Sequence, residues 1–147
     1  MSDLYDTDIV TWTERQASLL RRLAAGERVN DQVDWENVAE EIESVGRNEI
    51  DAIEAWLFQA SVHDLEAQAW PEARDVPAWP GEARVFRARA RRKYRPSMRQ
   101  RIDIAALYSD ALRALPETLD GRLALALPQA PARSPWKTFS QGREPSG

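Results

Sequence analysis

The chain has 147 residues, of which 24 are acidic and 20 are basic, so its formal net charge is -4. It contains no cysteine, which excludes disulfides, thiolate metal sites and cysteine nucleophiles. No apolar run approaches the ~18 to 20 residues that a membrane span needs, and the acidic start is unlike a cationic signal peptide. We therefore expect a cytoplasmic protein without membrane contact, with a single helical domain over residues 4–127.

The first predicted helix covers residues 6–25. Its apolar residues recur at intervals of about three and four, which places most of them on one face of a helix. They are Ile9, Trp12, Ala17, Leu20, Leu23 and Ala24. Asp6 or Thr7 is the predicted N-cap, and Gly26 is the predicted end.

A second, much longer helix is predicted over residues 34–68, with Asp34 as its N-cap. Its apolar stripe consists of Val38, Ile42, Val45, Ala52, Ile53, Trp56, Ala60, His63 and Ala67. The unbroken helix would span about 50 Å, so a kink at Gly46 is an open alternative. A helical glycine costs ~1 kcal/mol relative to alanine, which predicts that another backbone or a bulky ring approaches Gly46 closely. Trp35 and Trp70 either cap the bundle ends or form an exposed contact patch.

Three prolines, Pro71, Pro77 and Pro80, predict a non-helical connection to a third helix. That helix begins near Trp79 and continues through Ala83, Phe86, Ala90 and Tyr94. Pro96 starts a fourth helix, which Pro116 ends. Its stripe is Met98, Ile102, Ala105, Tyr108, Leu112 and Leu115.

The carboxyl-terminal part of the sequence is less regular. A short fifth helix over residues 117–127 is a further possibility. Residues 128–147 are rich in proline and poor in apolar side chains, so they are predicted to form a disordered tail. The fold class is therefore all-α, with four main helices in an antiparallel bundle.

Residues 34–49, with the sequence DWENVAEEIESVGRNE, resemble the signature of domain-of-unknown-function family 29, a bacterial all-helical family. Further matches across residues 4–115 are Leu4, Tyr5, Asp8, Trp12, His63, Leu65, Gln68, Pro71, Trp79, Arg87, Tyr108, Ser109, Asp110 and Ala111. Glu66 and Ala67 depart from the lysine and tryptophan usual in relatives, and the tail lacks the usual cysteine and closing apolar segment. The resemblance implies a helical bundle and carries no activity, ligand or partner.

Charge is segregated along the chain. Residues 31–54 hold nine acidic side chains against Arg47 alone, whereas residues 81–101 hold nine basic side chains against Glu82 alone. One interpretation is that the two oppositely charged helices pack side by side and neutralise each other. The other is that the arginines bind phosphate groups of RNA or DNA. The candidate phosphate-binding residues are Arg84, Arg87, Arg91 and Arg95.

A second candidate group of polar residues, structural or functional, consists of Glu40, Glu43, Arg47, His63 and Gln68. Carboxylates spaced at three and four residues can share a metal, but carboxylate-bridged bundles generally supply a Glu-x-x-His pair on each of two helices. His63 is the single histidine, so we predict no metal and no cofactor. His63 is either a half-buried structural residue or a general base.

The sequence does not establish a biochemical function. The leading hypothesis is a non-enzymatic protein-interaction or regulatory helical module that binds a protein partner or itself. The alternative is a nucleic-acid-associated protein that uses residues 84–101, and the third is an enzyme with His63 as base. The first two differ in whether the arginines face the acidic helix or the solvent.

Overall fold

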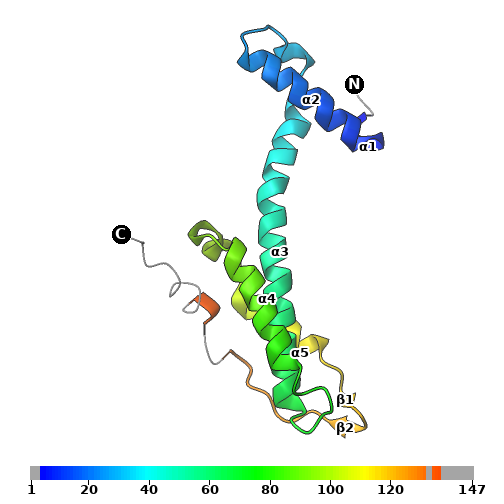
Figure 1. Ribbon diagram of the computed structural model, residues 1–147, viewed down its shortest axis with the longest axis vertical. Helices are drawn as coiled ribbons and strands as arrows, with labels where there is room; N and C mark the ends of the chain where they lie inside the picture. Colours follow the sequence, from blue (N-terminus) through cyan, green and yellow to red (C-terminus); the bar gives the residue numbers. More distant parts are fainter. Residues whose placement is uncertain (1–3, 132–133, 137–147) are drawn as a thin grey trace. The chain divides into compact units, whose positions relative to one another are not determined.

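The computed structural model describes residues 4–131 and 134–136 (Figure 1). Its helices confirm the all-α prediction: α1 (Leu4–Thr7), α2 (Ile9–Ala24), α3 (Trp35–Ala69), α4 (Trp79–Lys93) and α5 (Ile104–Ala114). Two 3-10 turns, η1 (Asn30–Gln32) and η2 (Pro96–Arg101), and two short strands, β1 (Thr118–Leu119) and β2 (Arg122–Leu123), complete the elements of this part of the chain. The chain divides into two compact units, Met1–Arg47 and Asn48–Gly147, and α3 contributes to both.

The segment predicted as a single helix over residues 6–25 forms two helices. Asp8 separates them and caps α2, because its carboxylate accepts the backbone N–H of Thr11 at 3.0 Å and the Thr11 hydroxyl at 2.7 Å. The predicted caps Asp6 and Thr7 lie inside α1 instead. Gly26 follows the end of α2 with a φ of 93°, a left-handed conformation that glycine adopts without strain.

The core of the first unit lies between α2, η1 and the start of α3. Its buried residues are Trp12, Leu19, Val29, Val33 and Val38. Ile9, predicted on the buried stripe, is exposed, and the polar Gln16 is buried instead. Gln16 is satisfied there because its Oε1 accepts the backbone N–H of Asp34 at 2.8 Å.

α3 is one uninterrupted helix from Trp35 to Ala69. Ile42 and Val45, predicted on its buried stripe, are 68% and 66% exposed. The predicted close approach at Gly46 is also wrong, since a Cβ placed there would meet nothing within 4 Å. The apolar stripe continues in the sequence, but no described element covers α3 at these residues.

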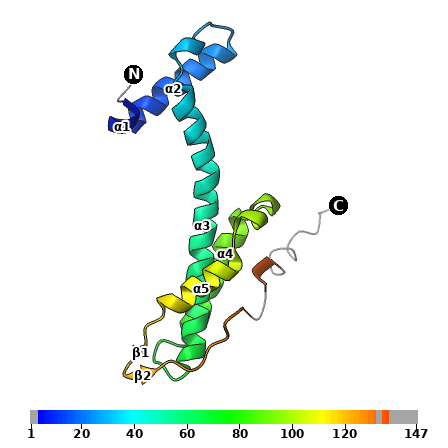
Figure 2. The ribbon, with the colours of Figure 1, turned by 180° about the vertical axis from the view of Figure 1, so that it is seen from behind.

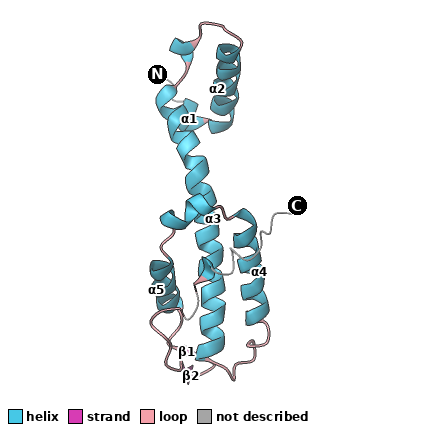
Figure 3. Cartoon of the chain, turned by 90° about the vertical axis from the view of Figure 1, so that its left-hand side faces the viewer, coloured by secondary structure: helices cyan, strands magenta, loops and turns pink. Residues whose placement is uncertain are grey.

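In the second unit, α4 and α5 flank the carboxyl-terminal part of α3 (Figures 2 and 3). One cluster of buried residues consists of Ile53, Leu57, Ala90 and Ile102, and another of Leu65, Tyr108 and Ala111. The proline-rich link between α3 and α4 is non-helical, as predicted. No helix in the described ranges is long and apolar enough to cross a membrane.

The predicted fourth helix begins later than its stripe suggested. Pro96 to Arg101 form the 3-10 turn η2, and Ile102 is buried in extended conformation. α5 then starts at Ile104 because the Asp103 carboxylate accepts the backbone N–H of Ala106 at 3.0 Å. A strong N-cap therefore sets the start of α5, which the apolar spacing alone did not show.

The possible fifth helix over residues 117–127 is wrong, because β1 and β2 form an antiparallel hairpin there. Thr118 pairs with Leu123, and Leu119 with Arg122. The two turn residues, Asp120 and Gly121, have φ values of 51° and 75°. Positive φ at both central residues is the geometry of the Asp-Gly turn, which favours a hairpin over a helix.

Most of the predicted tail over residues 128–147 lies outside the described residues, namely 132–133 and 137–147. Two of its described residues contact the second unit. The Tyr108 hydroxyl donates to the carbonyl oxygen of Pro128 at 2.7 Å, and the rings of Trp136 and Tyr94 lie 5.1 Å apart. These contacts hold the described part of the tail against α5 and the end of α4.

Replacing each of the two glycines of the first unit by alanine should change the free energy of unfolding in opposite directions. Gly46→Ala is expected to raise the free energy of unfolding by about 0.5 to 1 kcal/mol, because the helix gains propensity and the space is empty. Gly26→Ala is expected to lower it by about 1 to 2 kcal/mol, because its φ of 93° is strained for alanine. Urea denaturation followed by circular dichroism measures both, and destabilisation by Gly46→Ala would contradict the open surface.

Candidate functional site

The first residue of the family-like signature, Asp34, has a structural role. Its Oδ2 accepts the Asn37 side-chain amide at 2.8 Å and the Trp12 indole N–H at 3.0 Å, while its own backbone N–H is held by Gln16. The hydrogen bond from the Asn37 side chain, aided by those from Trp12 and the Asn37 backbone, lowers the pKa of Asp34. Asp34 therefore caps α3 as predicted and joins its start to α2.

The predicted polar cluster forms separate groups, each inside its own unit. In the first unit, Arg47 lies 2.6 Å from Glu40 and 3.7 Å from Glu43. All three side chains are more than half exposed, and such surface ion pairs contribute about 0 to 1 kcal/mol. Nearby, the Tyr5 hydroxyl donates to Glu41 at 2.6 Å, which raises the pKa of Tyr5 to about 12. These contacts support the helix surface and leave Ile42 and Val45 uncovered.

In the second unit, His63 lies between two carboxylates. Its Nδ1 is 3.4 Å from Glu66 on α3, its Nε2 is 3.4 Å from Glu82 on α4, and its ring stacks on Phe86 at 5.9 Å. The side chain is 19% exposed, and the buried Nδ1 has no hydrogen bond of good geometry. Burial also raises the pKa of Glu66. Both ring nitrogens of His63 therefore face protein carboxylates.

Gln68, the remaining member of the predicted cluster, is exposed and donates to the backbone carbonyl of Asp64 at 3.3 Å. It therefore contacts its own helix. Across the ranges 4–131 and 134–136, no group of three or more histidine, aspartate or glutamate side chains is arranged to hold a metal ion.

The four predicted phosphate-binding arginines of residues 84–95 have different surroundings. Arg87 forms an ion pair with Asp64 of α3, and burial lowers its pKa. Arg95 donates to the carbonyl oxygen of Tyr94 at 2.9 Å. Arg84 and Arg91 are exposed and form no ion pair with any described residue. The acidic helix therefore neutralises only part of the basic one.

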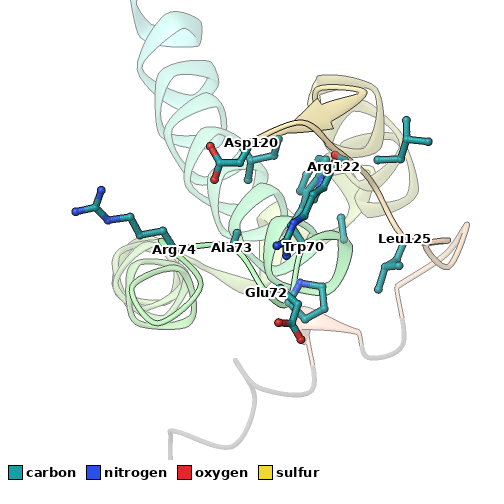
Figure 4. Close-up of a pocket in the computed structure, with 11 residues that line it drawn as sticks. Trp70, Glu72, Ala73, Arg74, Asp120, Arg122 and Leu125 are labelled. Carbon is teal, nitrogen blue, oxygen red and sulfur yellow. Dashed lines mark hydrogen bonds between the residues drawn. The ribbon is translucent and has the colours of Figure 1, made fainter.

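A pocket lies between the carboxyl end of α3 and the hairpin, and the sequence did not reveal it (Figure 4). Its volume is about 390 Å³, and it is lined by Ala69, Trp70, Pro71, Glu72, Ala73, Arg74, Leu119, Asp120, Arg122, Leu123 and Leu125. Two hydrogen bonds of 2.9 Å fix the hairpin to α3, one from the Trp70 indole to the Arg122 carbonyl and one from the Leu125 N–H to the Ala69 carbonyl. The sequence signal for this site was the Asp120–Gly121 dipeptide, which favours a hairpin turn.

The pocket combines apolar and charged surfaces. Leu123 and Leu125 are 76% and 56% exposed, whereas Trp70 is 3% exposed beneath the hairpin. The four charged lining residues are exposed, and they carry two positive and two negative charges; they are Glu72, Arg74, Asp120 and Arg122. Trp70 is therefore a packing residue, and the apolar contact surface consists of the two leucines.

A family model described as domain of unknown function DUF29 matches residues 4–140. The chain belongs to this family. Among solved structures, it is similar to an alpha-helical protein of unknown function from Rhodospirillum rubrum, whose crystal structure was determined at 1.45 Å resolution. The two chains are 25% identical with a TM-score of 0.55, and the match covers 97% of this chain and 99% of the other. No curated protein matches the chain. The family and the solved structure confirm the helical fold and assign no function.

The cap of α3 predicts an acid-dependent loss of stability. The pKa of Asp34 is lowered in the folded chain, so its ionised form stabilises the fold above its ordinary pKa of 3.8, and this contribution is lost as the pH falls through the lowered pKa. Asp34→Asn keeps a capping acceptor, so it should be less stable than the wild type at about pH 7 and approach it at about pH 3. Asp34→Ala should cost about 1 kcal/mol more at neutral pH.

Urea denaturation at both pH values measures these differences. Asp31→Asn, on an exposed residue of η1, is the matched control and should leave stability unchanged. Equal stabilities of the wild type and Asp34→Asn at about pH 7 would contradict the role of the charge.

The raised pKa of Glu66 predicts a pH dependence of stability opposite to that expected for Asp34. Burial raises its folded-state pKa, so stability is greatest while the carboxyl is protonated and falls as the pH rises through that pKa. Glu66→Gln removes the ionisation, and we expect this variant to be more stable than the wild type at about pH 7 and equal to it at about pH 4. Thermal unfolding over this range tests the expectation. A variant that is less stable at neutral pH would show that the contact with His63 outweighs the burial cost.

Proposed function

We propose that this DUF29 protein is a non-enzymatic protein-interaction module and that a partner protein docks at the pocket between α3 and the hairpin. The observation that carries the proposal is the exposure of Leu123 and Leu125, 76% and 56%, beside a pocket of about 390 Å³. Protein interfaces commonly place an apolar contact at the centre and charged side chains around it. The lining of this pocket has that composition.

The charged lining residues support a protein partner. Arg74 and Arg122 can pair with carboxylates of a partner, and Glu72 and Asp120 can pair with its cations. Such mixed charge adds specificity to an apolar contact. The hairpin is fixed to Ala69 and Trp70 by two hydrogen bonds, so the leucines lie on a scaffold that is already ordered before binding.

The test is an affinity capture from the native cell with quantitative comparison of variants. Leu123→Asp places a charge in the apolar contact, and we expect the bound amount of the partner to fall by about tenfold or more, as for a central interface residue. Val10→Asp is the matched control, because Val10 is 64% exposed on α2 in the other unit. It should retain the partner at the wild-type level.

Both variants alter exposed side chains, so their unfolding temperatures should equal that of the wild type. Retention of the same partners by Leu123→Asp, or capture of none by the wild type, would contradict the proposal.

A further inference from the structure

A basic surface lies on α4 and the η2 turn that follows it, and none of its residues lines the hairpin pocket. Residues 84–101 contain nine basic side chains and no acidic one. Eight of them are exposed, and Lys93, Arg89 and Arg95 among these contact Glu49, the Phe86 ring and a backbone carbonyl. The other five define what we call the arginine surface: Arg84, Arg91, Arg92, Arg99 and Arg101. We propose that the arginine surface binds the phosphate backbone of a nucleic acid.

The packing of α4 directs part of this surface to the solvent. α4 buries Trp79, Ala83 and Ala90, which lie on one side of the helix. Arg84 and Arg91 are seven residues apart, about two turns, so they point in nearly the same direction, away from that side. The apolar side of α4 is thus used in the core, and its opposite side presents cations.

Few of these charges are neutralised within the chain. Only two of the nine basic residues form ion pairs with acidic residues among those described, Arg87 with Asp64 and Lys93 with Glu49. Both acids are on α3, so the predicted pairing of the acidic and basic helices occurs at these two places. The charges of the arginine surface are therefore exposed to the solvent. Their contact with phosphates would release the counterions condensed on a nucleic acid, which favours association.

The net charge of the whole chain conceals this distribution. Residues 1–47 contain 11 acidic and five basic side chains, a net charge of -6, whereas residues 48–147 contain 13 acidic and 15 basic, a net charge of +2. The excess of negative charge therefore belongs to the unit that lacks the arginine surface. Overall acidity, which argues against nucleic-acid binding at the level of the sequence, does not describe the second unit.

A nucleic acid fits these observations better than an anionic membrane. Interfacial helices insert an apolar face into lipid, but the apolar face of α4 is buried in the core, and Val85 is its one exposed large aliphatic residue. Eight of the nine basic residues are arginines, whose guanidinium groups bind phosphate oxygens in pairs. A sequence-independent contact with a phosphate backbone follows from this composition.

Fluorescence anisotropy with labelled single-stranded RNA and duplex DNA of mixed sequence tests the proposal. Binding is expected at about 25 mM salt and should weaken linearly in log–log form as salt increases, with a slope of about -0.9 per contacted duplex phosphate. Arg91→Gln with Arg92→Gln should lower affinity at low salt by about tenfold and reduce the magnitude of the slope by about 2.

The matched control is Arg21→Gln with Arg28→Gln, which removes the same charge from exposed residues of the first unit. It should leave affinity for both nucleic acids within about twofold of the wild type. Equal loss in the control would show general electrostatic attraction and overturn the proposal.

Two further outcomes also overturn it. One is the absence of binding to either nucleic acid at low salt. The other is binding to phosphatidylglycerol vesicles or polyglutamate, but to no nucleic acid, with the same dependence on Arg91 and Arg92. The hairpin variant Leu123→Asp should bind nucleic acid like the wild type, so this result is independent of the proposed protein partner.

Discussion

Both units of the chain are built on α3, and each buried cluster includes residues from this one helix. Val38 belongs to the core of the first unit, Ile53 and Leu57 belong to one cluster of the second, and Leu65 belongs to the other. Helix propagation is cooperative, so packing at either end favours helical backbone in the residues between. The intervening residues can then remain helical although Ile42 and Val45 contribute to no buried cluster.

The helices were predictable wherever apolar spacing and helix-ending residues agreed. α4 begins and ends almost as predicted, because Pro80 suits a first turn and its stripe is covered by α3. The exposure of Ile42 and Val45 was not predictable, since periodicity shows which side chains share a face and not whether another element covers it. For the same reason the close approach predicted at Gly46 was wrong. The cost of this glycine in helix propensity has no compensating contact in the described chain.

The candidate sites were predictable to different degrees. The sequence indicated the segregation of charge and the cap at Asp34, but not which arginines α3 neutralises, because an ion pair depends on the rotation of two helices about their axes. The hairpin pocket was missed because the residues around Asp120 and Gly121 were interpreted by helical spacing, although that dipeptide favours a turn. The surroundings of His63 depend on Glu82, which lies on another helix.

The hydrogen bond from the Trp70 indole to the Arg122 carbonyl joins residues 52 positions apart, and the segment between them contains α4, η2 and α5. Closing so long a loop costs more conformational entropy than forming the short links between neighbouring helices. The order of folding follows from this difference, because α4 and α5 shorten the effective loop once they have packed on α3. We therefore expect the hairpin to join the unit late in folding, after the helices beneath the pocket are in place.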